Sequence, residues 1–304
     1  MMKKFKTLRE LEKAFPTEKS CIKYLEKHRW NGIIISLFDP TSKIYKLADG
    51  YYKCKKTGKK FNVKTGTIFK GTRIPLQTWF WALYNLVNRK KGISSYQLSE
   101  DTGITQKSAW NLLKDLRSEL KQSNFFKGMF KSEVEVDETY VGGSNPNRHW
   151  NKKVPHSQGR SWKDKTPVLV IKKRKGNVIA QVVPDVKRRT LEPIIIKHVE
   201  KGSSIYTDEW FAYDNLYREF NHQRVNHRKK QYANGRVSTN SAENFNGCLK
   251  RSIYGTHHWV SKKYMQIYVD EIVFRHNTRK YNKQERFDLV LGSVLDNSFQ
   301  QLIN

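Results

Sequence analysis

The stretch EVEVDETYVGG, residues 133–143, decides how the rest of the chain is read. Valines alternate with carboxylates up to Asp137, which predicts a strand that ends at this acid and leads to a turn at Gly142-Gly143. Acidic residues are scarce in this chain, with 28 Asp and Glu against 58 Lys and Arg. Carboxylates gathered at a strand end therefore favour a bound cation, most simply a metal ion. The alternative is an edge strand whose acids face water and discourage pairing with another sheet.

The chain has 304 residues, a formal net charge of +30 and an isoelectric point near 10.0. The length can hold two or three structural units. The charge predicts a polyanionic partner, first of all nucleic acid, because phosphates bind Lys and Arg. An anionic membrane surface competes, but no apolar run has transmembrane length and the amino terminus lacks a signal peptide. We therefore expect a cytoplasmic protein of a bacterium-like cell, associated with nucleoid DNA.

The region before residue 75 predicts two small modules. Residues 1–30 carry apolar side chains at helical spacing and predict two short helices. Residues 31–70 change to short apolar runs between turn residues, and segment 51–61 is typical of a hairpin. This second module is a small ribbon. The cysteines Cys21, Cys54 and Cys248 are too few and too widely spaced for a disulfide framework or a four-cysteine metal site.

Residues 75–121 form the clearest helical region. A helix, a turn at Gly103-Ile104-Thr105 and a second helix follow one another as in a helix-turn-helix. The second helix would present four polar side chains to a DNA major groove: Gln106, Lys107, Ser108 and Asn111. An ordinary helical hairpin is the alternative, and the basic charge of the chain favours the DNA-binding interpretation.

Residues 131–280 alternate strands and helices, which predicts an α/β domain with one mixed sheet covered by helices. After the strand at Asp137 we expect, in order, a mobile loop over 144–165, strands at 168–171 and 178–183, a helix at 190–200, a short strand before Asp208, and helices at about 240–250 and 262–280. Residues 281–304 are expected to form a C-terminal tail.

Three acids lie at comparable places in this order. Asp137 and Asp208 stand where predicted strands stop, and Glu243 lies in the first turn of a helix whose expected cap is Asn240. Converging carboxylates could hold two divalent ions, Mg²⁺ or Mn²⁺, for an in-line phosphoryl displacement. Lys250 lies two turns beyond Glu243 on the same helix face and could bind a phosphate.

Each acid also has a simpler explanation. Asp208 can be a turn residue, and Glu243 can be a helix-capping acid. Asp270 and Glu271 are rival candidates for the third ligand, although they lie inside a predicted helix where pairing with a nearby arginine is the simpler use. The scarcity of acids in this chain favours the shared site.

These motifs resemble those of the DDE transposases of the IS1595 insertion-sequence family, whose catalytic domain is called ISXO2-like. The resemblance runs from about Cys21 to Lys280 and rests on four stretches in the same order: VEVDETYVGG at 134–143, YTDEW at 206–210, NSAENF at 240–245 with KR at 250–251, and YVDEIVFRHN at 268–277. It implies a ribonuclease H-like domain in which Asp137, Asp208 and Glu243 bind metal and Lys250 is the associated basic residue. Asn246 departs from the family's third motif and is a minor candidate near the metal.

The resemblance also exposes a departure in the ribbon. Where the family carries two Cys-x-x-Cys pairs, this chain has Ser36, Asp39, Cys54 and Thr57. A structural zinc site needs four good ligands, so no zinc is expected and the degenerate ribbon would be held by its apolar residues. A weaker ion at Asp39 with Cys54, or at Cys21 with His28, is the alternative.

The resemblance, together with the basic charge and the three acids, implies an insertion-sequence transposase that binds its element's ends, cuts a DNA strand and joins the freed 3′ hydroxyl to target DNA. Its partners would be the terminal repeats and the target DNA, and holding two ends together favours a homodimer on DNA. The basic residues Arg224, Arg228, Lys229 and Lys230 are expected to contact phosphates, with a solvated loop as the alternative. The alternative function is a DNA-binding protein or regulator derived from a transposase, without catalytic activity.

Overall fold

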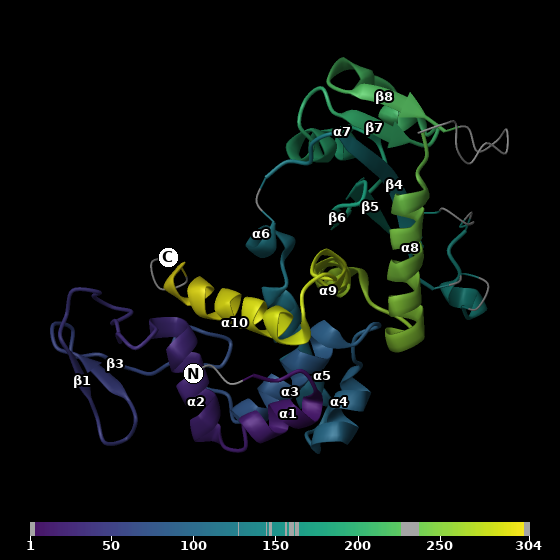
Figure 1. Cartoon of the computed structure of the whole chain (residues 1–304). Helices are drawn as coiled ribbons and strands as arrows, with labels where there is room; N and C mark the ends of the chain where they lie inside the picture. The colour runs from purple at the N-terminus through teal and green to yellow at the C-terminus, as the bar shows by residue number, and fades with distance from the viewer. Residues whose placement is uncertain are drawn as a thin grey trace. The chain divides into compact units, whose positions relative to one another are not determined.

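The computed structural model describes residues 4–126, 128–143, 145, 148–155, 157, 161, 164–225 and 237–300, with the backbone alone for 296–300. The chain divides into two compact units, Met1–Leu120 with Lys280–Asn304, and Lys121–Arg279 (Figure 1). We call them the first and the second unit. Within the described residues, no helix combines the length and apolar character needed to cross a membrane.

Two capped helices open the first unit. α1 (Leu8–Ala14) follows Thr7 and α2 (Glu18–Trp30) follows Thr17, and each threonine hydroxyl accepts a hydrogen bond from a backbone N–H of the first turn. Such caps satisfy amide groups that have no partner inside the helix. The two short helices predicted near the amino terminus are therefore present.

An aromatic core joins α3 (Leu76–Asn88) to α10 (Lys283–Gln300). Phe287 on α10 is fully buried, and its ring packs edge to face against Phe5 and Phe80, with centroids 5.3 Å apart in both cases. The segment expected to be a C-terminal tail is therefore mostly a helix of the first unit. Its apolar residues pack against the amino-terminal helices, a pairing that local sequence does not reveal.

The ribbon is a three-stranded antiparallel sheet of β1 (Ile44–Lys46), β2 (Tyr52–Cys54) and β3 (Lys60–Phe61). The predicted hairpin is its β2–β3 pair. The Asp39 carboxylate pairs with Lys56 Nζ at 3.2 Å, so this acid is engaged at the surface of the ribbon.

At the positions where the family carries zinc-binding cysteines, the ribbon has the hydroxyl side chains of Ser36 and Thr57 next to Cys54. Burial raises the pKa of the Cys54 thiol, but hydrogen bonds with the side chains of Ser36, Ser42 and Thr57 outweigh it and bring this pKa to about 6. The Ser36 hydroxyl also accepts hydrogen bonds from the backbone N–H groups of Phe38 and Asp39. A hydrogen-bonded thiol and hydroxyl cluster thus fills this place.

α4 (Ser95–Thr102) and α5 (Gln106–Glu119) follow each other across a short turn. Gly103 has a φ of 71°, a left-handed conformation that glycine adopts at little cost. The Thr105 hydroxyl accepts a hydrogen bond from Ser108 N and begins α5. The helix, turn and helix predicted from the sequence lie at the expected positions.

The second unit contains a five-stranded sheet in the order β6-β5-β4-β7-β8. The strands are β4 (Glu133–Val141), β5 (Thr166–Lys173), β6 (Val178–Val182), β7 (Ser204–Thr207) and β8 (Asn221–Arg224). β4 pairs antiparallel with β5 and parallel with β7, so the predicted mixed sheet is confirmed. The expectation that the strand stops at Asp137 is wrong, because the ladder with β5 continues to Val141.

Helices cover both faces of this sheet. They are α7 (Arg188–His198) and the 3-10 helix η3 (Phe211–Arg218) on one face, and α8 (Asn240–Ser252) and α9 (Met265–Asn277) on the other. Val136 belongs to the core under α7 and η3, whereas Val141 belongs to the core under α8 and α9. Side chains alternate along a strand, so Asp137 lies on the α8 face and Glu138 on the η3 face.

Shorter elements complete the second unit. They are α6 (Gln122–Phe125), the 3-10 helices η2 (Trp150–Lys152) and η6 (Lys262–Tyr264), and the π-helix η5 (Ile253–His257). α8 begins at Asn240 with Thr239 in the cap position, so Asn240 is not the cap. Of the loop expected over 144–165, several residues lie outside those described.

Candidate metal centre

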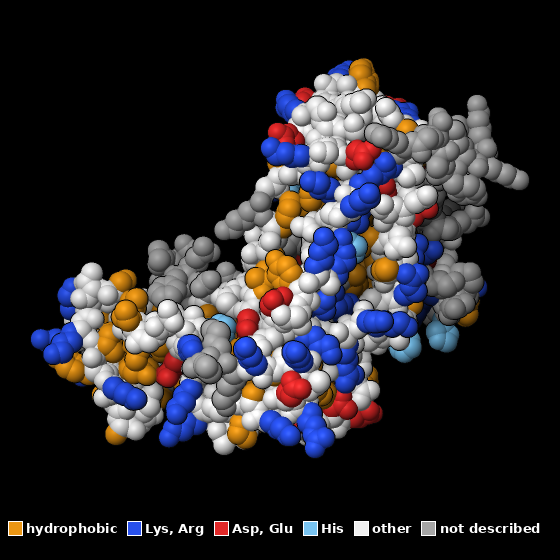
Figure 2. All heavy atoms as spheres, viewed as in Figure 1, with side chains coloured by type: hydrophobic (Ala, Val, Ile, Leu, Met, Phe, Trp, Pro, Cys, Tyr) orange, Lys and Arg blue, Asp and Glu red, His pale blue; other side chains and the backbone are white. Residues whose placement is uncertain are grey.

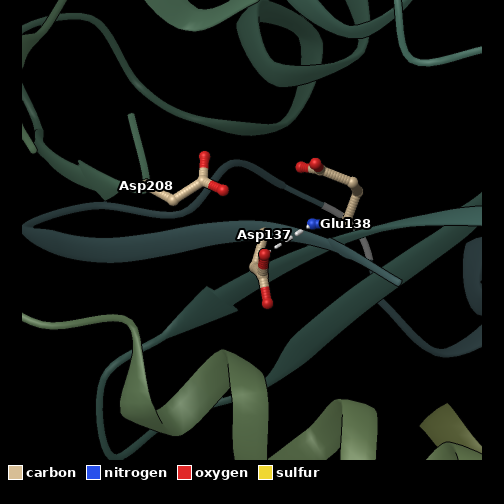
Figure 3. A group of neighbouring side chains, drawn as sticks. All are labelled: Asp137, Glu138 and Asp208. Atoms are coloured by element: carbon tan, nitrogen blue, oxygen red, sulfur yellow. Dashed lines mark hydrogen bonds between the residues drawn. The ribbon is translucent and has the colours of Figure 1, made fainter. Parts of the chain in front are cut away.

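Three carboxylates lie close together just beyond the parallel pairing of β4 and β7 (Figure 3). Ligand oxygens of Asp137, Glu138 and Asp208 all lie within 4.8 Å of one another. Glu135 on β4 pairs with Tyr206 on β7, and an aspartate follows two residues later in each case, Asp137 and Asp208. The structure therefore brings together two of the three acids that the sequence singles out.

This grouping makes negative charge unfavourable at Asp137. Burial, together with the carboxylates of Glu138, Asp208 and Glu243, raises the pKa of Asp137 to about 8. A divalent cation among the same oxygens would reverse the balance, because an opposite charge favours the ionised form. The electrostatics of the site thus match a cation-binding role.

Asn246 orients Asp137 from α8. Its Nδ2 donates a 2.8 Å hydrogen bond to Asp137 Oδ2, and the Glu138 backbone N–H donates to Asp137 Oδ1 at 2.9 Å. The Asn246 side chain is buried, and its Oδ1 has no hydrogen-bond partner in the described part of the chain. A buried oxygen without a partner is costly, and beside a carboxylate it is a suitable ligand for a hard cation.

Glu138 is the member of the group that sequence reasoning missed. Its Oε2 accepts a 2.7 Å hydrogen bond from the buried Tyr213 hydroxyl. In Figure 3 its side chain extends to the same side of β4 as Asp208, opposite to Asp137. Strand alternation separates Glu138 from Asp137, so the pattern alone does not join them. Their adjacency as an Asp-Glu pair is the signal that could have found it.

α8 carries the other two predicted catalytic residues. Glu243 lies in its first turn and its Oε1 accepts a 3.0 Å hydrogen bond from Thr239 Oγ1. The Glu243 carboxylate is close enough to raise the pKa of Asp137, but it is not among the three acids that converge within 4.8 Å. Lys250 is half-buried on the same helix. Glu243 therefore lies near Asp137 but is not one of the three acids whose oxygens converge.

The rival acids are engaged inside the protein. Asp270 Oδ1 accepts hydrogen bonds from Gln122 Nε2 at 2.7 Å and from Gln266 Nε2 at 2.8 Å. Glu271 forms an ion pair with Arg275, one turn later on α9. These partners account for both carboxylates without a metal.

The predicted DNA contacts of α5 differ in exposure. Lys107 and Asn111 are exposed, whereas Gln106 and Ser108 are half-buried. Gln106 Nε2 donates to Ser95 Oγ at 2.9 Å, and Ser108 takes part in the helix cap. Lys107 and Asn111 are therefore the side chains of this set that are available to a partner.

The predicted phosphate contacts near β8 are described only in part. Arg224 is exposed at the end of the strand and pairs with Asp214 Oδ1 at 2.7 Å. Arg228, Lys229 and Lys230 lie outside the described residues. On the faces visible in Figure 2, Lys and Arg side chains are spread widely over both units and acidic side chains are fewer.

Comparison with known proteins places this fold in a family. The family model of the ISXO2-like transposase domain matches residues 129–277. An uncharacterized transposase-like protein of Haemophilus influenzae is 33% identical over 124 residues, which cover 40% of this chain and 99% of that protein. The chain belongs to the ISXO2-like transposase family. This transposase is also 26% identical, over 300 residues, to an uncharacterized protein in the transposable element ISH50 of Halobacterium salinarum, with 93% of this chain and 99% of that protein covered.

The family generally uses divalent metals, and the donors of this transposase fit such ions. Asp137, Glu138 and Asp208 offer carboxylate oxygens, and Asn246 offers a buried amide oxygen without a partner among the described residues. Hard cations such as Mg²⁺ and Mn²⁺ prefer oxygen ligands of this kind.

Proposed function

We propose that this transposase cuts DNA at the ends of its element and joins the freed 3′ hydroxyl to target DNA, with divalent ions held by the DDE set Asp137, Asp208 and Glu243. The observation that carries the proposal is the convergence of oxygens of Asp137, Glu138 and Asp208 within 4.8 Å in a strongly basic chain. The Glu243 carboxylate lies close enough to raise the pKa of Asp137. Like charges gather in a folded protein at a substantial electrostatic cost, which a bound cation offsets.

A pair of Mg²⁺ or Mn²⁺ ions would supply charge neutralisation and activation of the attacking oxygen in an in-line displacement. Within this scheme Asp137 and Asp208 bind from the sheet and Glu243 from α8. Asn246 holds the Asp137 carboxylate in one orientation through its amide hydrogen bond. Lys250 binds a DNA phosphate as a point charge.

We infer that α4 and α5 act as a helix-turn-helix on the terminal repeats. The exposed side chains of Lys107 and Asn111 on α5 support this assignment, because a recognition helix needs free polar groups near its amino end. Since two element ends must be held together during strand transfer, we expect the transposase to act as a homodimer on DNA.

The test is a Mg²⁺-dependent cleavage assay on DNA that carries candidate end sequences. Asp137→Asn, Asp208→Asn and Glu243→Gln are each expected to reduce cutting by about a hundredfold or more while DNA binding persists. Glu219→Gln is the matched control, because this half-buried acid pairs with Lys201 at 2.8 Å and its substitution should not affect cutting.

Unchanged cutting by the Asp137→Asn protein would exclude the proposed mechanism. If the unmodified protein binds element ends but cuts none of them with either metal, the chain is instead a DNA-binding regulator derived from a transposase.

A further inference from the structure

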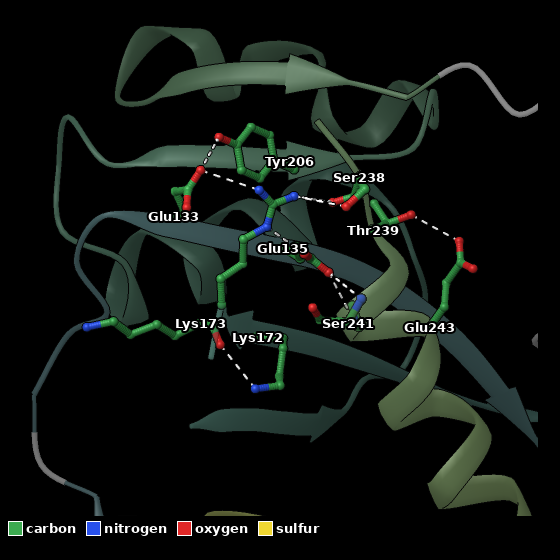
Figure 4. A network of polar contacts seen from close by, with 11 residues as sticks. Glu133, Glu135, Lys172, Lys173, Tyr206, Ser238, Thr239, Ser241 and Glu243 are labelled. Atoms are coloured by element: carbon green, nitrogen blue, oxygen red, sulfur yellow. Dashed lines mark hydrogen bonds and ion pairs between the residues drawn. The ribbon is translucent and has the colours of Figure 1, made fainter. Parts of the chain in front are cut away.

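We propose that Glu135 and Arg174 are positioning residues that fix the start of α8 on β4 and thereby hold Glu243 near Asp137. The inference rests on the proposed metal-dependent function. We call the group of Glu135, Arg174, Ser238, Ser241 and Ala242 the α8 clamp. Figure 4 labels Glu135, Ser238 and Ser241 of this group.

Glu135 is the centre of the α8 clamp. Its side chain is 1% exposed, and its Oε2 accepts hydrogen bonds from the backbone N–H groups of Ser241 at 2.7 Å and Ala242 at 3.0 Å. These amides belong to the first turn of α8, where N–H groups have no partner inside the helix and a negative charge is favourable. A carboxylate from the sheet thus caps the helix that carries Glu243.

Arg174 holds the chain just before the helix. Its Nε donates to Glu135 Oε1 at 2.8 Å, and its Nη2 donates to the backbone oxygen and the hydroxyl of Ser238, at 3.1 and 3.0 Å. The guanidinium carbon also lies 4.3 Å from the centre of the Tyr206 ring on β7. The planar guanidinium group therefore links β4, β7 and the entry to α8 in one geometry.

The α8 clamp lies directly beside the metal-binding acids. Glu135 precedes Asp137 by two residues, so both side chains lie on the α8 face of β4. Glu243 directly follows Ala242, whose backbone N–H donates to Glu135. Thr239 directly follows Ser238, which Arg174 binds, and its hydroxyl donates a hydrogen bond to the Glu243 carboxylate. The hydrogen bonds on both sides of the helix start therefore set the distance of Glu243 from Asp137.

A purely structural ion pair is the competing explanation. Buried ion pairs add little net stability compared with apolar residues, and this one directs its remaining hydrogen bonds to the α8 entry. Glu133 provides a matched comparison, because its Oε1 accepts hydrogen bonds from Arg174 Nη1 at 3.3 Å and from the Tyr206 hydroxyl at 2.9 Å, and within the described residues none links it to α8. Substitution of Glu133 perturbs the same arginine and leaves the helix cap intact.

The experiment measures metal binding to the full chain without DNA. Bound Fe²⁺ with ascorbate and peroxide cleaves the backbone near its ligands, and Mn²⁺ titration gives the affinity. The unmodified protein should be cleaved near residues 137, 208 and 243. Glu135→Ala should keep the first two cuts, lose the cut near 243 and bind Mn²⁺ about 10- to 100-fold more weakly. Glu133→Gln should behave as the unmodified protein.

Arg174→Lys covers the case in which Glu135→Ala does not fold, because lysine keeps a positive charge but lacks the planar set of spaced donors by which Arg174 binds Glu135 and Ser238 at once. It should also lose the cut near 243. A folded Arg174→Lys or Glu135→Ala protein that retains this cut and the Mn²⁺ affinity would overturn the role of the α8 clamp. Absence of cuts near 137 and 208 in the unmodified protein would instead reject the metal site itself.

Discussion

At the residue scale, the proposed metal site centres on Asp137, a carboxyl group that is difficult to ionise. The Asp137 side chain faces α8, accepts hydrogen bonds from Asn246 and the Glu138 amide, and has other acids around it. Such a group destabilises the folded protein when it is charged and no cation is present. The metal-free protein therefore has a pH dependence that reports on the site.

The first prediction concerns this pH dependence. The pKa of Asp137 is about 8 in the folded protein against an ordinary value of 3.8. The folded state binds the proton more tightly, so this contribution to stability is complete below pH 4 and is lost as the pH rises through 8. Asp137→Asn should raise the free energy of unfolding of the metal-free protein at pH 8 by about 2 to 5 kcal/mol, and the gain should shrink toward pH 4.

Urea unfolding in EDTA at several pH values measures this gain. Asp185→Asn is a control of opposite sign, because hydrogen bonds from Thr190 and Lys187 lower the pKa of Asp185. That substitution should lower stability at neutral pH. An Asp137→Asn protein that is no more stable than the unmodified protein at pH 8 would contradict the proposed electrostatics.

The second prediction concerns stability with metal, where the unmodified protein and not the Asp137→Asn protein should gain. Mn²⁺ at a hundred times its dissociation constant should stabilise the unmodified protein by about 2.7 kcal/mol. Asp137→Asn and Asp208→Asn should lose most of this gain, because each removes one of the proposed metal ligands. Thermal unfolding with and without Mn²⁺ checks the difference, and equal stabilisation of all three proteins would contradict it.

At the element scale, the sequence predicts most of what lies along one strand or helix and misses what lies between them. The periodicity of β5, β6, α5 and α8 gives their existence and approximate limits. The alternating pattern places the end of β4 too early, because residues up to Val141 pair with β5 and this pairing is not visible in the local sequence. Glu138 and the α8 clamp were missed for the same reason, since their partners Tyr213, Arg174 and Ser241 are distant in the chain.

The third prediction belongs to α5. If this helix reads DNA, Lys107→Ala should weaken binding to all sequences and reduce the salt dependence of log K by about 1. Asn111→Ala should reduce discrimination between element ends and unrelated DNA by about 1 to 3 kcal/mol. Lys13→Ala is the matched control, an exposed lysine in the last turn of α1. Binding titrations at several salt concentrations measure all three, and equal effects of Lys13 and Lys107 would argue against a recognition helix.

At the scale of the whole molecule, the two units are built from different parts of the chain. The first unit combines residues before 121 with residues after 279, whereas the second is one continuous segment. This division of the first unit also explains why the sequence predicts only a tail for residues 281–304. A single helix at the end of a chain does not reveal that it packs against residues near the start.

The fourth prediction tests this composition. Phe287→Ala removes a fully buried ring that contacts Phe5 and Phe80. It should destabilise the first unit by about 3 to 5 kcal/mol and leave Mn²⁺ binding in the second unit unchanged. Leu289→Ala on the same helix is the control, because Leu289 is 36% exposed and should have a small effect. Loss of Mn²⁺ binding in the Phe287→Ala protein would contradict the independence of the two cores.

The position of α10 also has a consequence for biosynthesis. Ribosomes release the polypeptide from its amino end, so the segment from 121 to 279 emerges before α10. We therefore expect the second unit to be able to fold during translation. The first unit cannot complete its aromatic core until α10 has been synthesised. A premature stop codon ahead of α10 would leave a chain with a complete second unit and an unfinished first unit.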